Sequence, residues 1–310
     1  MNNFNSNPII NEQISNVNLK AYMVGFDLND LGTKEYRLDK LICILTDVIP
    51  EFAFGLHQGT LTENTKLISK IKDAAKSIYK LNVFNEVNEI YENDGYLDDN
   101  DERKYLRRGE FGELILHLLL RDFHNTIPLI SKIYFKDSYG HAVHGFDSIH
   151  IDPIEKTLWL GESKIYLNGK SGIKELVNDI KEHIKTDFLN DEFTIISKRV
   201  TDDFSIPERD EWLRIMNSNT KLSDKLKSIK IPLLCTYTSK NFSDYDDESL
   251  EDFKIAFENE INELKAHFDD NNDHPLKDKL DIILLLFPIK SKKDLVRGLH
   301  RNLTLIQNLI

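Results

Sequence analysis

The chain is poor in cysteine and has no long apolar run. Its 310 residues include two cysteines, Cys43 and Cys235, and neither belongs to a Cys-x-x-Cys or Cys/His pattern. Both lie among apolar neighbours, so we expect buried free thiols rather than a disulfide or a zinc site. No apolar stretch approaches the roughly 20 residues that a membrane span needs, and residues 1–8 lack the basic and apolar segments of a signal peptide. We therefore expect a soluble, cytoplasmic protein.

Positive charge is also scarce. There are 40 Lys and Arg against 52 Asp and Glu, which gives a net charge of −12. This balance is unfavourable for gripping nucleic acid unaided, because affinity for phosphates depends on clustered Lys and Arg. Either basic side chains gather locally or a partner holds the nucleic acid. Local clusters occur within residues 103–108, 221–230 and 290–301, and each could be a solvated helix face or a phosphate track.

Residues 1–100 and 101–310 differ in character. The first part indicates an N-terminal support region with a strand and helices. The second part alternates strands with helices, which predicts an α/β fold: a mixed β-sheet flanked by helices, with helical N-terminal and inserted segments. With 40% hydrophobic residues, the chain has enough apolar content for an ordinary core. We expect the two parts to form one compact unit.

Apolar periodicity and the positions of Gly, Pro and polar residues predict the individual elements. The predicted helices are 37–49, ended by Pro50, then 63–91 as one or two helices, 109–120, 171–187 with Ser171 as its cap, 248–268, and 291–310 with a capping pattern at Ser291. The predicted strands are 18–26, 144–152, 158–166, 231–238 and 280–287. Residues 188–230 are expected to add helices and loops.

Two of these strands bring acidic residues together. Residues 158–166 are apolar on both faces and should be buried, so a charged residue in their middle, Glu162, requires an explanation. A hairpin turn centred on Ile154 and Glu155 would place Asp147 of the preceding strand opposite Glu162. Opposed like charges destabilise a sheet unless something positive lies between them. A hard divalent cation held by carboxylate oxygens is the simplest candidate.

Lys164 follows Glu162 by two residues and shares its strand face. Its ammonium group could orient a nucleophilic water or offset negative charge on a phosphoryl oxygen. Such a set predicts metal-assisted hydrolysis of a phosphodiester. The alternative is an exposed cross-strand ion pair, which is common in a chain with 30% charged residues. The apolar flanks and the opposed Asp147 favour the catalytic interpretation.

The helix predicted at residues 109–120 supplies further candidates. Its apolar residues recur at helical spacing and should form one buried stripe. Glu110, Glu113 and His117 follow one edge of that stripe, so either glutamate can lean over a sheet packed below. The alternative is a solvated rim whose negative charge is favourable near a helix start.

Three histidines near the first strand of the hairpin, His141, His144 and His150, suggest a zinc site. By strand alternation, however, Asp147 falls on the opposite face from His144 and His150. We therefore expect these histidines to be substrate contacts or surface residues.

A helix Glu, a strand Asp and a Glu-x-Lys, in this order over residues 110–164, resemble the PD-(D/E)xK nuclease superfamily. The sequences around them are similar to those of the HamA family, the effectors of Hachiman anti-phage defence. These sequences are Arg108-Gly-Glu-Phe-Gly-Glu113 and Gly161-Glu-Ser-Lys164. The resemblance extends from about Leu19 to the last helix and includes Pro50-Glu-Phe-Ala-Phe54. One departure is Gly145-Phe146, which precedes Asp147 where the superfamily pattern has Pro.

This resemblance implies a PD-(D/E)xK-like core and a DNA endonuclease that depends on Mg²⁺ or Mn²⁺. Asp147 and Glu162 would hold the metal, Lys164 would assist the attack, and Glu113, in preference to Glu110, would complete the site. It also implies a helicase partner, HamB, that senses DNA and controls the nuclease. The rival interpretation is a catalytically silent scaffold or regulatory subunit, and the intact set of carboxylates and lysine argues against it.

Overall fold

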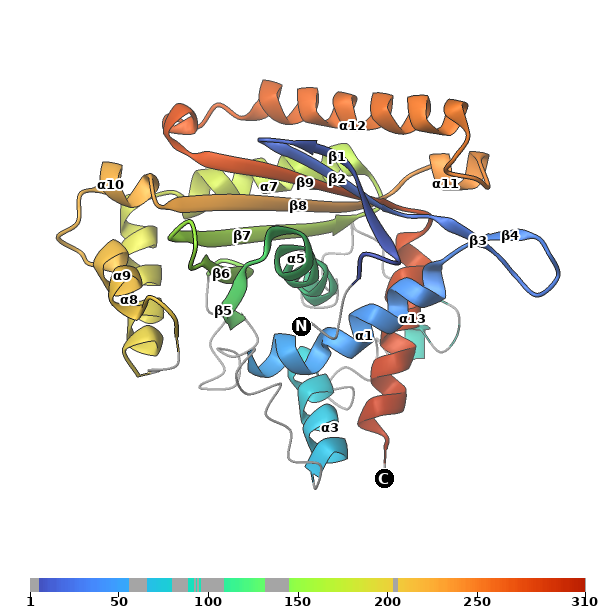
Figure 1. Ribbon diagram of the computed structural model, residues 1–310, viewed down its shortest axis with the longest axis horizontal. Helices are drawn as coiled ribbons and strands as arrows, with labels where there is room; N and C mark the ends of the chain where they lie inside the picture. The colour runs from blue at the N-terminus through green and yellow to red at the C-terminus, as the bar shows by residue number, and fades with distance from the viewer. Residues whose placement is uncertain are drawn as a thin grey trace.

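A seven-stranded β-sheet forms the centre of the protein, as the computed structural model in Figure 1 shows. The structure describes residues 6–55, 66–79, 89–91, 93, 95, 109–131, 145–202 and 206–309. The strands of the sheet are β1 (Ile10–Asn16), β2 (Leu19–Val24), β5 (Ile127–Ser131), β6 (Ser148–Asp152), β7 (Thr157–Tyr166), β8 (Ile229–Thr238) and β9 (Asp281–Ile289). A separate two-stranded hairpin consists of β3 (Phe26–Leu28) and β4 (Lys34–Tyr36).

The helices that surround the sheet are α1 (Leu38–Phe54), α3 (Leu67–Ile78), α5 (Gly109–His124), α7 (Gly169–His183), α8 (Thr186–Asp202), α9 (Arg209–Met216), α10 (Leu222–Leu226), α11 (Asn241–Asp244), α12 (Glu251–Asn271) and α13 (Lys292–Gln307). A short 3-10 turn, η4 (Lys277–Lys279), precedes β9. Among the described residues, no helix combines the length and the apolar character needed to cross a membrane.

The order of the strands is β1-β2-β9-β8-β7-β6-β5. The four middle strands, from β2 to β7, pair in parallel, whereas β1, β6 and β5 pair antiparallel with their neighbours. The parallel strands β8 and β9 are buried along almost their whole length, because helices cover both faces. The predicted α/β fold with a mixed sheet and flanking helices is confirmed.

Three glycines show how closely α5 and α7 approach the two opposite faces of β7. A Cβ on Gly112 of α5 would lie 3.2 Å from the Ser163 hydroxyl, and one on Gly161 would meet Leu116 of α5. On the other face, a Cβ on Gly172 of α7 would lie 2.6 Å from the Cys235 sulfur. Strand alternation then places Ser163 on the α5 side, and Glu162 and Lys164 on the α7 side. In Figure 1, α12 lies beyond α7, and α1, α3 and α13 lie beyond α5.

The contact between Gly172 and Cys235 gives a prediction for stability. Gly172→Ala should lower the free energy of unfolding by about 1–3 kcal/mol through overpacking, although alanine favours helix. In a Cys235→Ala background the sulfur is absent, so the same substitution should be neutral or stabilising. Urea denaturation of the two single variants and the double variant measures this coupling. Equal effects of Gly172→Ala in both backgrounds would contradict it.

Helix α1 corrects the prediction that Pro50 ends a helix at residue 49. The helix continues to Phe54, with Pro50 inside it. Proline lacks the amide that would bond the carbonyl of Thr46, and such a position costs about 3 kcal/mol. Phe52 and Ala53 are buried in the core beyond the proline. This burial offsets the missing hydrogen bond, so tertiary packing decides the end of the helix.

Other local predictions were also wrong. Asn168, not Ser171, caps α7, because its side-chain oxygen accepts a hydrogen bond from the Ser171 amide at 3.1 Å. The expected helix 171–187 divides into α7 and α8. The edge strand β1 was missed, since its sequence is mostly polar and its side chains are mostly exposed. The cap of α13 by Ser291 is confirmed, with its hydroxyl accepting from the Asp294 amide at 3.2 Å.

The two cysteines differ in environment. Both are free thiols, as expected. Cys235 is buried in β8, and burial raises the pKa of its thiol to about 12. Cys43 is exposed, contrary to prediction, because it lies on the outward side of α1 while its neighbours Leu41 and Ile42 face the core. Apolar neighbours in sequence do not bury a helical residue that points outwards.

Candidate active site

The β6–β7 hairpin has the predicted register. Its pairs run from Asp152 opposite Thr157 to Ser148 opposite Gly161, all equidistant from a centre between residues 154 and 155. The next pair outward in this register is Asp147 with Glu162. Asp147 lies one residue before β6, so the two carboxylates meet where the paired part of the hairpin ends.

Asp147 is held at this end of the hairpin by its neighbour across the ladder. One of its carboxylate oxygens, Oδ2, accepts hydrogen bonds from the backbone amide of Ser163 at 3.0 Å and from the Ser163 hydroxyl at 2.9 Å. The side chain is buried, with 6% of its surface exposed. Two donors to one oxygen fix the orientation of the carboxylate.

Glu162 is buried in the middle of β7 and contacts α7. Its Oε1 lies 2.5 Å from Nδ1 of His183. Burial, and then the negative charge of Asp147, raise the pKa of the Glu162 carboxyl to about 7, although His183 acts in the opposite direction. Burial lowers the pKa of His183, but the hydrogen bond and charge of Glu162 outweigh it and raise that pKa. The pair therefore holds a proton near neutral pH.

Lys164 also points towards α7, where its ammonium group forms an ion pair with Asp179. Burial lowers the pKa of Lys164, but the charges of Asp147, Asp179 and Glu162 outweigh it and raise the pKa above its ordinary value. The side chain thus stays cationic at neutral pH. It is suited to stabilising negative charge and unsuited to acting as a general base.

Sequence reasoning missed Asp179 and His183, the two α7 residues that contact the Glu-x-Lys motif. They lie four residues apart, which places them on one edge of the helix. The apolar stripe of α7 lies beside this edge and consists of Ile173, Leu176, Val177 and Ile180. A polar pair at helical spacing beside a buried stripe was therefore the available signal.

Aromatic rings enclose His183. Its ring stacks on Phe188 with centroids 4.4 Å apart, and it meets the Phe146 ring in a T-shaped arrangement with centroids 5.6 Å apart. Phe146 is buried directly before Asp147. Phe146 thus packs against the partner of Glu162, and this contact links the residues just before β6 to α7.

Helix α5 carries Glu113 and is buried on all sides between residues 111 and 121. Glu113 and His117 are 5% and 2% exposed, so the solvated-rim interpretation is wrong for both, while Glu110 is half-buried. Helix α5 covers the Ser163 side of β7, opposite to Glu162 and Lys164. Within the described part of the chain, no group of three or more His, Cys, Asp and Glu is arranged to hold a metal. The roles of Glu113 and Glu110 stay predictions.

His150 is not a surface residue, contrary to prediction. It is fully buried, with its ring contacting the Thr126 hydroxyl at 2.8 Å and the His117 ring at 3.2 Å. Burial lowers the pKa of His150 well below its ordinary range. Its strand face is covered by α5, which the sequence pattern of β6 alone does not reveal. His141 and His144 lie outside the described residues.

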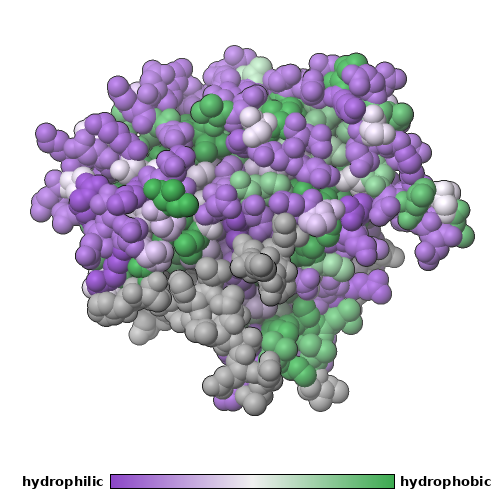
Figure 2. All heavy atoms as spheres, in the orientation of Figure 1, coloured by the Kyte–Doolittle hydropathy of each residue, from purple (hydrophilic) through white to green (hydrophobic). Residues whose placement is uncertain are grey.

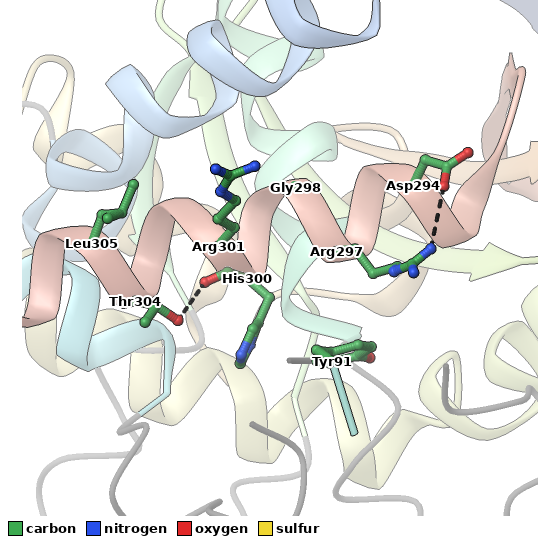
Figure 3. Close-up of a pocket in the computed structure, with 8 residues that line it drawn as sticks. All are labelled: Tyr91, Asp294, Arg297, Gly298, His300, Arg301, Thr304 and Leu305. Atoms are coloured by element: carbon green, nitrogen blue, oxygen red, sulfur yellow. Dashed lines mark hydrogen bonds and ion pairs between the residues drawn. The ribbon is translucent and has the colours of Figure 1, made fainter. Parts of the chain in front are cut away.

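Each of the two basic clusters that the structure describes has one lysine buried in the protein. A cavity of about 480 Å³ beside α13 is lined by Arg297 and Arg301 of the third cluster, and Arg297 pairs with Asp294 at 3.7 Å (Figure 3). Lys292 is buried over the ring of Tyr166. In the second cluster Lys225 is buried. The cluster within residues 103–108 lies outside the described residues.

The raised pKa of Glu162 predicts how stability changes with pH. The folded state holds this proton up to about pH 7, whereas an unfolded Glu loses it near pH 4.3. This contribution to stability is therefore complete below about pH 4.3 and is lost as pH rises towards 7, with a magnitude on the order of 1–3 kcal/mol. Urea denaturation of the wild type and Glu162→Gln, with chelator, tests this. A difference between them that does not vary with pH would contradict it.

Comparison with known proteins finds a similarity that covers far more of the chain than the β6–β7 hairpin. The family model for HamA matches residues 2–303. No curated protein matches the chain. The matched residues include the whole seven-stranded sheet and every candidate residue of the site. With nearly its whole length covered, this chain belongs to the HamA family of the Hachiman defence system.

Proposed function

We propose that this chain is a divalent-metal-dependent DNA endonuclease, the effector of a Hachiman system, controlled by a helicase partner. The observation that carries the proposal is the end of the β6–β7 hairpin. Two buried carboxylates, Asp147 and Glu162, interact there strongly enough that Asp147 raises the pKa of Glu162. Lys164 lies on the same strand face and stays cationic.

The donor set fits a hard cation. Both groups offer carboxylate oxygens, and Mg²⁺ is commonly held by one or two carboxylates together with waters and substrate phosphates. Glu162 contacts His183 through Oε1 alone, so its other oxygen can face a cation. A divalent ion between Asp147 and Glu162 would offset the repulsion that now favours protonation. A phosphate oxygen of the substrate is one candidate for a further ligand. Glu113 is the other, and it would approach from the Ser163 side of β7, where Asp147 accepts a hydrogen bond from the Ser163 hydroxyl.

The remaining chemistry belongs to the chain itself. When bound, the cation would supply Lewis acidity to a phosphoryl oxygen and a nucleophilic water of lowered pKa. Lys164 would offset the negative charge that develops on the phosphoryl oxygens, and Asp179 would keep its ammonium group in place. His183 would hold the Glu162 carboxylate in one orientation. In the reaction, water would attack phosphorus and one P–O ester bond would break, so that the products are a phosphate monoester and a free hydroxyl group.

Partner control rests on charge and on family membership. A chain with a net charge of −12 should bind bare DNA weakly, because few favourable phosphate contacts offset long-range repulsion. A helicase subunit, HamB in this family, would supply the affinity for DNA. The nuclease would then respond to ATP turnover in the partner, which requires the partner to favour one of two states of the complex.

Cleavage assays test both parts of this proposal. We expect plasmid and linear DNA to be cut with Mg²⁺ or Mn²⁺ and to stay intact with chelator. The complex with the helicase should be compared in ATP, in a non-hydrolysable analogue and with a hydrolysis-dead helicase. Equal rates in all three, matching the chain alone, would refute partner control. No cleavage by a folded chain or complex under any condition would favour the silent scaffold.

A further inference from the structure

The β3–β4 hairpin projects from the body of the protein, away from the seven-stranded sheet (Figure 1). It has three residues in each strand, with Phe26 opposite Tyr36 at its base and Leu28 opposite Lys34 near its tip. An isolated two-stranded hairpin is marginally stable in water. Its order therefore depends on how its base and its tip are held.

The base is anchored firmly to the core. The rings of Phe26 and Tyr36 pack on each other and on Phe242, with centroids 5.2–6.2 Å apart. The Phe26 amide donates to the Glu248 carboxylate at 3.0 Å. Nearer the tip, Lys34 forms an ion pair with Asp247. These contacts hold the hairpin in one orientation relative to the sheet.

The tip is organised by one side chain. Oδ1 of Asn29 accepts hydrogen bonds from the Leu31 amide at 3.0 Å, the Thr33 amide at 3.0 Å and the Thr33 hydroxyl at 2.9 Å. Gly32 takes a positive φ of 75°, which completes the turn. The result presents Leu31 and Leu28 to solvent, with 88% and 65% of their surfaces exposed. Green atoms stand among purple ones on the projection at the right edge of Figure 2.

The outer side of the hairpin is acidic. Asp27 lies directly opposite Glu35 in the ladder, and both are exposed. Like charges directly opposed destabilise a hairpin, so this pair is unfavourable for the free chain. Arg37 offsets it weakly, with its guanidinium 3.8 Å from Asp27. Asp30 at the tip adds further exposed negative charge.

We propose that this hairpin is a docking element for a protein partner that offers an apolar pocket bordered by Lys and Arg. The two leucines would fill the pocket. Asp27 and Glu35, which lie on the other face of the hairpin from Leu28, would contact the basic border on that side. Preorganisation of the tip lowers the entropy cost of binding. The same charges disfavour DNA and a second copy of this chain, whose net charge is −12. The helicase is the partner to test, and this choice rests on the proposed function.

The experiment measures binding of the full chain to the immobilised helicase subunit over a series of salt concentrations. Leu28→Ser combined with Leu31→Ser should raise the dissociation constant by at least about tenfold. The matched control is Val17→Ser, which replaces a 90% exposed residue in the β1–β2 turn. This control should change the dissociation constant by less than about twofold. The double variant Asp27→Asn with Glu35→Gln should bind the helicase more weakly, and its binding should depend less on salt concentration. Its melting temperature should equal or exceed that of the wild type, because the opposed like charges are removed.

Each outcome decides the inference. Binding of the leucine variant at wild-type strength would overturn the docking role while the helicase partnership stands. No binding by the unmodified chain would remove both the helicase partner and this inference. A dimer of this chain that the leucine variant dissolves, or DNA binding that it abolishes, would reassign the hairpin to those ligands. Melting curves of every variant show that the fold is intact.

Discussion

Replacing Lys164 with Met should lower metal-dependent DNA cleavage by about 10²–10³-fold, because it removes the fixed positive charge that stabilises the transition state. The methionine keeps most of the length of the side chain, and the fold should persist, since Lys164 is only partly buried beside α7. Cleavage is measured under single-turnover conditions with Mg²⁺ in excess. Wild-type rates in a well-folded variant would refute the role of Lys164.

Lys170→Met is the matched control for this substitution. Lys170 lies on α7, and its ammonium group pairs with Glu263 at 2.5 Å on the surface, as Lys164 pairs with Asp179 at the site. A surface pair of this kind contributes at most about 1 kcal/mol, so cleavage should be unchanged. An equal loss of activity in both variants would show that α7, rather than the charge at the site, had been disturbed.

Asp147→Asn separates metal binding from folding. The asparagine oxygen can still accept the hydrogen bonds from Ser163. The amide lacks the charge that a hard cation requires, so affinity for Mn²⁺ and cleavage should be lost together. Calorimetry with Mn²⁺ gives the affinity and denaturation gives the stability. Loss of cleavage with unchanged Mn²⁺ affinity would remove Asp147 from the set of ligands.

The hairpin could be predicted from the sequence because its causes are local. Strand alternation, apolar flanks around Glu162 and a polar turn together determine which residues oppose each other. The partners Asp179 and His183 could not be predicted, since their contacts depend on how α7 packs across the sheet. The predictions that Pro50 ends a helix and that Cys43 is buried were wrong for the same reason. Both used local sequence, whereas packing against the core decided the outcome.

Helix α5 shows where periodicity reaches its limit. The spacing of apolar residues predicts one buried stripe, and a single stripe leaves Glu113 and His117 at its rim. In the structure α5 lies between the sheet and α1, so it is buried on both sides. Burial of the second side comes from the N-terminal region, and the pattern of α5 contains little sign of it. His117 there approaches Glu51 of α1 at 3.5 Å.

Glu51 also belongs to a buried network of charged side chains, which has a large expected effect on stability. Arg121 of α5 is 6% exposed. Its guanidinium donates to Glu51 of α1 at 2.7 Å and to Asp122 at 2.6 Å and 3.1 Å. Asp122 in turn accepts hydrogen bonds from the amide and hydroxyl of Ser6. One guanidinium thus joins α5, α1 and the segment before β1.

Arg121→Met should lower the free energy of unfolding by about 3–5 kcal/mol, because it leaves two carboxylates buried without their cation. Burial raises the pKa of Glu51, but His117 and Arg121 outweigh it and lower that pKa. Stability from this lowered pKa is present above the unfolded value and is lost as pH falls, so the difference between wild type and variant should be largest at neutral pH.

Adding Glu51→Gln removes one uncompensated charge and should recover part of the loss. Urea denaturation at several pH values measures both effects. A loss below about 1 kcal/mol, or a double variant no more stable than Arg121→Met, would mean that water or other groups already compensate these carboxylates.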